Sequence, residues 1–205
     1  MAKHVQPGED IRIAPGITGK RENEGELIII DDWNRDREQL YPKDNIEHKI
    51  RIFERQVKEW FLERASSLLS DEDNGFVILM IATSYIEGIE QYRKGQPSDG
   101  KSRAFFEDGL KRIFGIKSCF EDRLYDLFKE LRCGLFHNGM TGRYIRIHSM
   151  LIDKPIDFSD DKIININQRL FLEKVVEDFE QYLTDLKGTT KTDLRNNFNK
   201  MYTFE

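Results

Sequence analysis

Apolar residues recur at the three- or four-residue spacing of an amphipathic α-helix in about five segments of this 205-residue chain. The first segment, residues 45 to 69, follows Asp44, which forms a capping-box pattern with Glu47. The second, residues 76 to 89, is apolar on every side and should be the most buried helix. The remaining three begin at a capping residue and end at or before a glycine: 102–115, 118–138 and 167–188. This spacing predicts a mainly α fold, a helical bundle of about five helices.

Two further regions carry short runs typical of β-strands. Ile11–Ala14 and Glu26–Asp31 predict two strands near the N-terminus, and Gly16–Lys20 between them predicts a hairpin turn. This GITGK stretch does not fit a phosphate-binding loop, because only two residues separate its glycines and Arg21 follows the lysine. Tyr144–Ile147 and the run 163–166 predict a small β-hairpin after the fourth helix.

The expected domain organisation follows from these elements. Residues 1–44 form an N-terminal arm with short strands, residues 45–187 form the helical domain, and residues 188–205 form a polar C-terminal tail, which we expect to be frayed or packed late. The predicted fold class is therefore mainly α, with a small β-hairpin and an N-terminal β-containing arm.

Net charge and the distribution of apolar residues limit which partners and which cellular compartment we expect. The formal net charge of −5 means that any contact with nucleic acid would depend on a local basic patch. No run approaches the roughly 18 apolar residues of a membrane span, and MAKHVQPGED lacks the apolar stretch of a signal peptide. We therefore expect a cytoplasmic protein that does not contact a membrane.

The cysteines and histidines give no sign of a metal site or a disulfide. On one helix, Cys119 and Cys133 would lie about 21 Å apart, beyond the limit of about 7 Å for a disulfide, so both are predicted to be free thiols. Two cysteines and four scattered histidines form no cluster at metal-binding spacing. We expect no metal and no cofactor.

The segment from Glu121 to Gly142, EDRLYDLFKELRCGLFHNGMTG, has two distinct helical faces. One face is a core stripe made of Leu124, Leu127, Phe128, Leu131 and Leu135. Arg132 and His137 flank the opposite face, with Cys133 and Phe136 between them. A helix that already has a full core face and also carries Phe136 is expected to contact a second surface.

In the sequence LRCGLFHNG, four residues separate the arginine from the histidine, and on a late helix of a small helical protein this motif resembles the signature of the HEPN superfamily. The resemblance covers residues 45–187 and implies a HEPN-like helical bundle. It implies that Arg132 and His137 are the catalytic residues of a metal-independent endoribonuclease, with a composite site across a homodimer formed by the motif-helix face. It also implies RNA or a nucleotide as ligand, and a role as a toxin or phage-defence effector, with an antitoxin protein as a further partner. Cys133 stands where the family usually has Asn, Asp or His.

The chemistry of the two residues suits RNA cleavage. RNA carries its own nucleophile, the 2′-OH, so cleavage without a metal needs only proton transfer and charge stabilisation. A histidine titrates near neutral pH, and an arginine makes two hydrogen bonds to a phosphate. In a dimer, one His137 could act as base and the other as acid. Arg143 and Arg146, just beyond Gly142, are predicted to bind neighbouring phosphates of the substrate.

The residues also allow simpler roles for the motif. Arg132 could pair with Asp122, Asp126 or Glu130 on its own helix, and His137 could be a favourable cation at the helix C-terminus. Glu87, inside the apolar second helix, could pair with a basic residue or act beside the arginine and the histidine.

Two other functions remain open. One is a non-catalytic HEPN-like module that binds a nucleotide or a protein. The other is an interaction module that binds a partner through an exposed strand edge at Ile28–Ile30.

Overall fold

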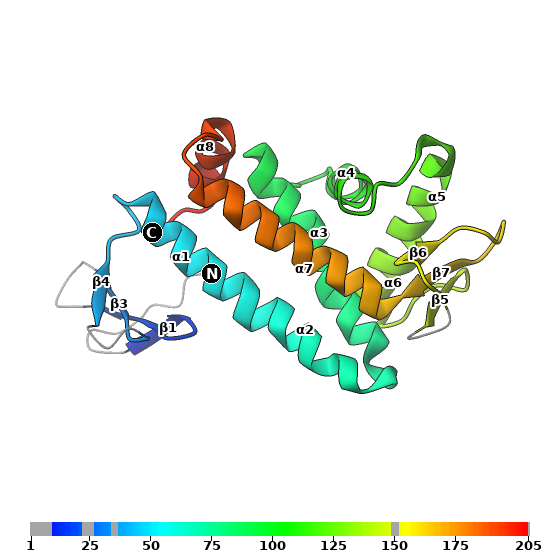
Figure 1. The fold of residues 1–205 in the computed structure, drawn as a ribbon, viewed down its shortest axis with the longest axis horizontal. Helices are drawn as coiled ribbons and strands as arrows, with labels where there is room; N and C mark the ends of the chain where they lie inside the picture. The colour runs from blue at the N-terminus through cyan, green and yellow to red at the C-terminus, as the bar shows by residue number, and fades with distance from the viewer. Residues whose placement is uncertain (1–9, 22–26, 34–36, 149–151, 205) are drawn as a thin grey trace. The chain divides into compact units, whose positions relative to one another are not determined.

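The computed structural model describes residues 10–21, 27–33, 37–148 and 152–204. Over these residues the chain is mainly helical, as predicted, with two small sheets (Figure 1). The chain divides into two compact units, residues 1–61 with 202–205 and residues 62–201. This division differs from the expected one, because the first helix belongs to the N-terminal unit. None of the helices in the described ranges is both long and apolar enough to cross a membrane.

The first unit contains an antiparallel sheet of strand order β1-β2-β3-β4. The strands are β1 (Asp10–Ala14), β2 (Ile17–Arg21), β3 (Leu27–Asp31) and β4 (Glu38–Leu40). The hairpin after β1 is confirmed, but the turn is shorter than predicted, and most of GITGK forms strand β2. Glu26, the first residue of the second predicted strand, lies outside the described residues. The predicted exposed edge at Ile28–Ile30 is wrong, because β3 pairs on both sides, with β2 and β4.

Helix α1 (Ile46–Val57) belongs to the same unit, and a buried carboxylate ties the sheet to it. Asp31 is fully buried at the end of β3 and accepts two hydrogen bonds of 2.7 Å from Arg55 of α1. The helix begins one residue later than predicted, because the side chain of Asn45 accepts from Glu47 N at 2.9 Å. A buried charge needs such pairing, so this contact fixes α1 on the sheet.

The chain remains helical to about the predicted residue. A π-helical stretch, η1 (Lys58–Leu62), follows α1, and α2 (Glu63–Ser67) and the 3₁₀ turn η2 (Leu68–Ser70) come next. A second 3₁₀ turn, η3 (Glu72–Asn74), leads into the next helix.

The second unit is built around α3 (Gly75–Lys94), the predicted buried helix, with α4 (Ser102–Phe114), α7 (Gln168–Lys187) and α8 (Thr192–Met201) packed against or beside it (Figure 1). Its fully buried side chains include Ile78, Leu79, Ile86, Phe106, Leu110, Phe171, Phe179 and Phe198. The predicted ends at Gly115 and Gly188 and the predicted cap at Asn167 are confirmed. Of the two states expected for the C-terminal tail, frayed or packed, the structure shows the packed one, because α8 buries Phe198 completely.

A charged network joins three helices of this unit. The hydroxyl of Tyr85 on α3 donates to Asp178 of α7 at 2.8 Å. Arg112 of α4 donates to the same carboxylate and, at 2.6 Å, to Glu90 of α3. Burial, and then the charge of Asp178, raise the pKa of Tyr85 well above its usual value. The network fixes the relative positions of α3, α4 and α7.

The motif segment is one helical run of changing pitch. It comprises the 3₁₀ turn η4 (Ser118–Phe120), α5 (Glu121–Asp126), the π-helix η5 (Leu127–Cys133) and α6 (Gly134–Asn138). Gly139, in the left-handed conformation with φ of 68°, ends the run where predicted. The core stripe is confirmed for Leu124, Leu127, Leu131 and Leu135, which are at most 1 % exposed.

The predicted β-hairpin after this helix is wrong in its pairing. The strands β5 (Ile145–His148), β6 (Ile156–Asp157) and β7 (Ile164–Asn167) form a sheet of order β5-β7-β6. A short strand inside the expected loop, β6, pairs antiparallel with β7 and takes one of its edges. Strand β5 pairs with the other edge of β7, and this pairing is parallel.

Candidate functional site

Arg132 is held by a carboxylate from the central helix. Its Nε and Nη2 lie 3.1 Å and 2.8 Å from Oε2 of Glu87 on α3. The second oxygen, Oε1, accepts a hydrogen bond of 2.9 Å from Ser98 in the α3–α4 loop. The Arg132 and Glu87 side chains are 21 % and 12 % exposed. The pair is therefore mostly, but not fully, removed from water.

The helix that carries Arg132 is locally widened. Arg132 lies in the last turn of the π-helix η5, and it is flanked one turn away on each side by an aromatic ring. Its guanidinium carbon is 4.8 Å from the ring centre of Phe136 and 5.9 Å from that of Phe128. Single-turn π-helical segments occur frequently at functional sites, and here one positions the predicted catalytic arginine.

His137 lies five residues further on, in the last turn of α6, and is exposed. In the described part of the chain its imidazole makes no hydrogen bond and no ion pair, and none joins it to Arg132. Its ring is therefore open to a ligand or to a partner surface.

The pairs considered for Arg132 on its own helix are not the ones that form. Asp126 lies 3.4 Å from Arg123, and Glu130 lies 3.8 Å from Lys129. The observed partner of Arg132, Glu87, comes from a helix 45 positions earlier in the chain.

Arg143 and Arg146 are both exposed. Within the described ranges no hydrogen bond or ion pair places either of them at Arg132 or His137. The guanidinium of Arg143 stacks on the ring of Tyr144 at 4.6 Å. Arg146 lies on β5 near Asp160, whose pKa is lowered mainly by the backbone N–H groups of Ile163 and Lys162, and to a lesser extent by Arg146 itself.

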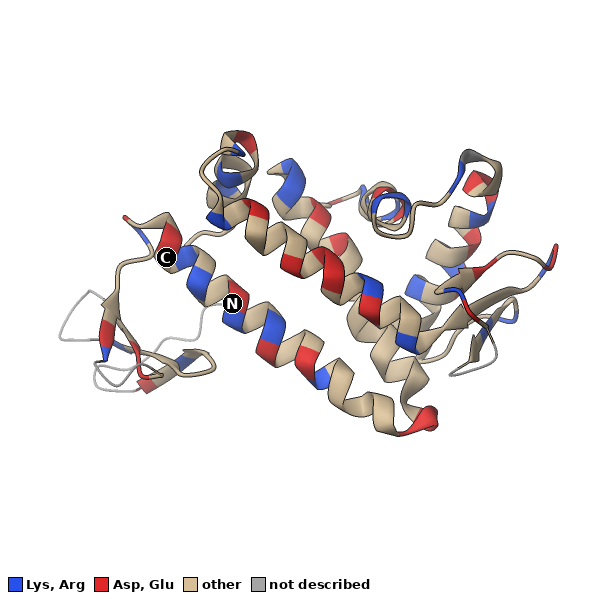
Figure 2. Ribbon diagram, viewed as in Figure 1, with Lys and Arg blue, Asp and Glu red and all other residues tan. Residues whose placement is uncertain are grey.

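Large apolar side chains are exposed on α3, which carries Glu87, and in the segment that follows Arg132. Phe136 on α6 is 42 % exposed and Met140, just after it, is 62 % exposed. On α3, Phe76 and Val77 are 38 % and 48 % exposed. Lys and Arg are interspersed with Asp and Glu along the helices of this unit, so no helix displays a basic stripe in the described ranges (Figure 2).

The site has no ligand set for a metal. Over the described residues no three His, Cys, Asp or Glu side chains group closely enough to hold an ion. Cys119 and Cys133 are free thiols, as predicted.

Sequence reasoning identified Arg132, His137 and, as one alternative, Glu87. It missed Ser98, because a serine in a Gly- and Pro-containing loop, GQPSDGKS, gives no signal beyond a surface turn.

Comparison of the sequence with family models and with curated proteins, and of the fold with solved structures, gives no match.

Proposed function

We propose that the protein is a metal-independent endoribonuclease of HEPN type that acts as a homodimer in the cytoplasm. The observation that carries the proposal is the pairing of Arg132 with Glu87 in a π-helical turn, five residues before His137, which is exposed and makes no hydrogen bond or ion pair in the described part of the chain. A positioned cation and an accessible proton carrier are the two groups that 2′-OH attack on a phosphodiester requires.

In this mechanism His137 takes the proton of the 2′-OH as the oxygen attacks phosphorus. Arg132 stabilises the extra negative charge on the phosphorane-like transition state. A proton must then be given to the departing 5′-oxygen. The His137 of the second chain supplies it, because one histidine that has just accepted a proton cannot act as base and acid in the same step. The products are a 2′,3′-cyclic phosphate and a free 5′-hydroxyl.

The exposed apolar side chains support the dimer. Phe136 and Met140 flank His137 in sequence, and Phe76 and Val77 lie on the helix that carries Glu87. Burying such side chains against a second copy is favourable by about 25 cal/mol per Å² of apolar surface. A twofold axis beside α6 would bring the two His137 side chains toward one substrate. Arg143 and Arg146 would contact phosphates flanking the cleaved bond.

The test is incubation of purified protein with total RNA in EDTA. Fragments with 2′,3′-cyclic phosphate ends are expected, and His137→Ala should abolish them. Asn138→Ala removes a polar side chain from the same exposed turn and serves as the matched control, with cleavage retained. Cleavage that survives His137→Ala, or that needs added magnesium, would refute the proposal.

A second candidate is a non-catalytic module that binds a nucleotide or a protein. It is favoured by Glu87, which already neutralises Arg132 within the chain, and by Cys133, which stands at a position that is polar in the family. Such a module would bind RNA or nucleotide in EDTA without releasing product. A toxin or phage-defence role, with an antitoxin as partner, would follow from cleavage and would appear as growth arrest that His137→Ala relieves.

A further inference from the structure

The first unit has an open surface hollow, which we call the cavity, that the proposed ribonuclease site does not use. Its volume is about 490 Å³, and its lining includes Asp10, Arg12, Gly16, Thr18 and Trp33. All of these belong to the first unit. This volume is within the usual range for small-molecule sites, which are mostly a few hundred to about 1,000 Å³.

Trp33 is exposed but held in one position. The residue is 59 % exposed, although its indole lies directly over Gly16, where an added Cβ would be 1.8 Å from Cδ1 of the ring. The guanidinium of Arg55 lies 4.6 Å from the ring centre, and Arg55 is itself fixed by its two bonds to buried Asp31. The backbone N–H of Trp33 donates to the same carboxylate at 3.1 Å. Gly16 and Arg55 both lie against the indole, and the ring also lines the cavity.

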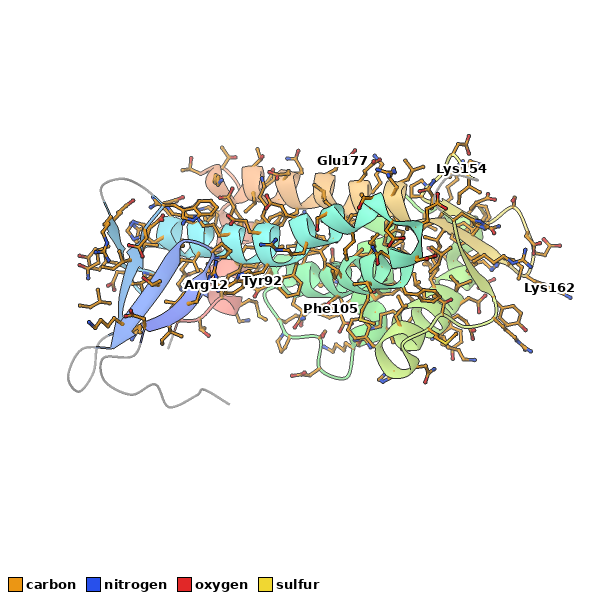
Figure 3. All side chains as sticks on the ribbon, turned by 90° about the horizontal axis from the view of Figure 1, so that it is seen from below. Arg12, Tyr92, Phe105, Lys154, Lys162 and Glu177 are labelled. Atoms are coloured by element: carbon orange, nitrogen blue, oxygen red, sulfur yellow. The ribbon has the colours of Figure 1, made fainter. Side chains whose placement is uncertain are left out.

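Two opposite charges without partners lie on the strand that borders the ring. Asp10 and Arg12 of β1 are both exposed, and in the described ranges neither makes a hydrogen bond or an ion pair (Figure 3 labels Arg12). As alternate residues of a strand they point to the same face, about 7 Å apart along it. The cavity therefore offers a partly exposed aromatic ring, together with a hydrogen-bond acceptor and a cation that make no other contact of these kinds in the described chain.

We propose that this cavity binds a nucleotide, with its base stacked on Trp33, its phosphate paired with Arg12 and its exocyclic amine donating to Asp10. An indole stacks on any base, arginine is the side chain best suited to a phosphate, and a carboxylate accepts from a base amine. Guanine, adenine and cytosine nucleotides carry all three matching groups, whereas uracil lacks the amine. The site stands on its own residues and does not depend on Arg132 or His137.

The binding assay uses the fluorescence of Trp33 itself. The chain has two tryptophans, so Trp60→Phe leaves Trp33 as the only one. In that background, with His137→Ala added to prevent cleavage of RNA, titration with each of the four nucleoside monophosphates should quench the fluorescence. GMP, AMP and CMP should bind more tightly than UMP, and Asp10→Ala, which leaves no side-chain acceptor at this position, should remove this preference.

Substitutions in the cavity test the assigned contacts by calorimetry, with no need for a tryptophan signal. Trp33→Ala should weaken binding about five- to 150-fold, the range for loss of one stacked base, and Trp33→Phe should retain part of the affinity. Arg12→Gln should reduce the slope of log affinity against log salt for a single-stranded RNA by about 0.7. Lys43→Gln removes an exposed charge from the same unit away from the cavity, and should leave mononucleotide binding unchanged.

A comparison of ligands shows whether the natural ligand is an RNA strand or a free nucleotide. If a short single-stranded RNA binds more tightly than any monophosphate, the natural ligand is a strand, and if a monophosphate binds as tightly, it is a free nucleotide. Failure of all four monophosphates and of RNA to quench Trp33 would overturn the proposal. Binding that Trp33→Ala leaves unchanged, or equal affinity for all four bases, would do so as well. None of these outcomes depends on whether the protein cleaves RNA.

Discussion

Removal of the Glu87 carboxylate should destabilise the second unit measurably. In Glu87→Ala the guanidinium of Arg132, whose side chain is only 21 % exposed, would lose its partner, and Ser98 would lose its acceptor. Exposed ion pairs contribute about 0–1 kcal/mol, whereas breaking a buried pair costs about 3–5 kcal/mol. Because this pair is mostly buried but still reaches water, we expect a loss of about 2 kcal/mol in the free energy of unfolding.

Urea denaturation followed by circular dichroism measures this loss. Both tryptophans lie in the first unit, whereas most helical residues lie in the second, so the helical signal reports mainly on the unit that carries the pair. With a slope of about 2 kcal/mol per molar urea, the midpoint should fall by about 1 M. Glu63→Ala removes an exposed carboxylate from α2 and is the matched control, expected within about 0.5 kcal/mol of the wild type.

A double-mutant cycle decides whether the pair itself is responsible. Glu87→Ala and Arg132→Ala together should cost less than the sum of the two, by about 1–2 kcal/mol, because the second substitution removes the charge that the first leaves unpaired. A coupling energy near zero, or a Glu87→Ala midpoint equal to that of the wild type, would refute the argument that burial makes this pair important.

Two further predictions concern the helical core. Since burial and Asp178 raise the pKa of Tyr85, the neutral phenol is the form favoured by folding, so stability should be fully present below the ordinary tyrosine pKa of about 10 and should fall as the pH rises above it. Tyr85→Phe should flatten this fall, and the absorbance of tyrosinate in wild type and variant should show one phenol that titrates late. Asn167→Ala should cost about 1–2 kcal/mol in a urea titration, because its side chain accepts from Arg169 N and Leu170 N and donates to Ile152 O. An unchanged midpoint would mean that water replaces the cap at no cost.

Helix positions were predictable because their signals are local. Gly115, Gly139 and Gly188 end helices where predicted, since each terminus depends on the conformation of one or two residues. Sheet pairing was not predictable in the same way. Strand β7 pairs in parallel with β5 and antiparallel with β6, a two-residue strand inside the expected loop, so the expected hairpin does not form. A strand of that length leaves almost no pattern in a sequence.

The difference between local signals and tertiary contacts also applies to the candidate site. Periodicity placed Arg132 at the flank of the back face, about 80° from the core stripe. In the structure Arg132 pairs with Glu87 of the central helix α3, and part of its own helix is π-helical and departs from the assumed 100° per residue. Spacing could suggest only partners three or four residues away, such as Asp126. The actual partner depends on which turn of α3 packs against η5, which is tertiary information. A carboxylate within an apolar helix nevertheless indicates that a cation must come from elsewhere, because a buried charge without a partner is too costly.

The geometry of the pair shows how one arginine can be both structural and catalytic. Glu87 accepts from Nε and Nη2, which is the side edge of the guanidinium. An arginine has five N–H donors, so the two on Nη1 and one on Nη2 remain for a phosphate at the other edge. Arg132→Lys separates the two roles, since an ammonium still neutralises Glu87 but has no second edge to offer. If Arg132 is catalytic, the lysine variant should unfold within about 1 kcal/mol of the wild type while its cleavage of RNA falls steeply. If Arg132 only holds α3 against the motif helix, stability and RNA binding should both survive the change.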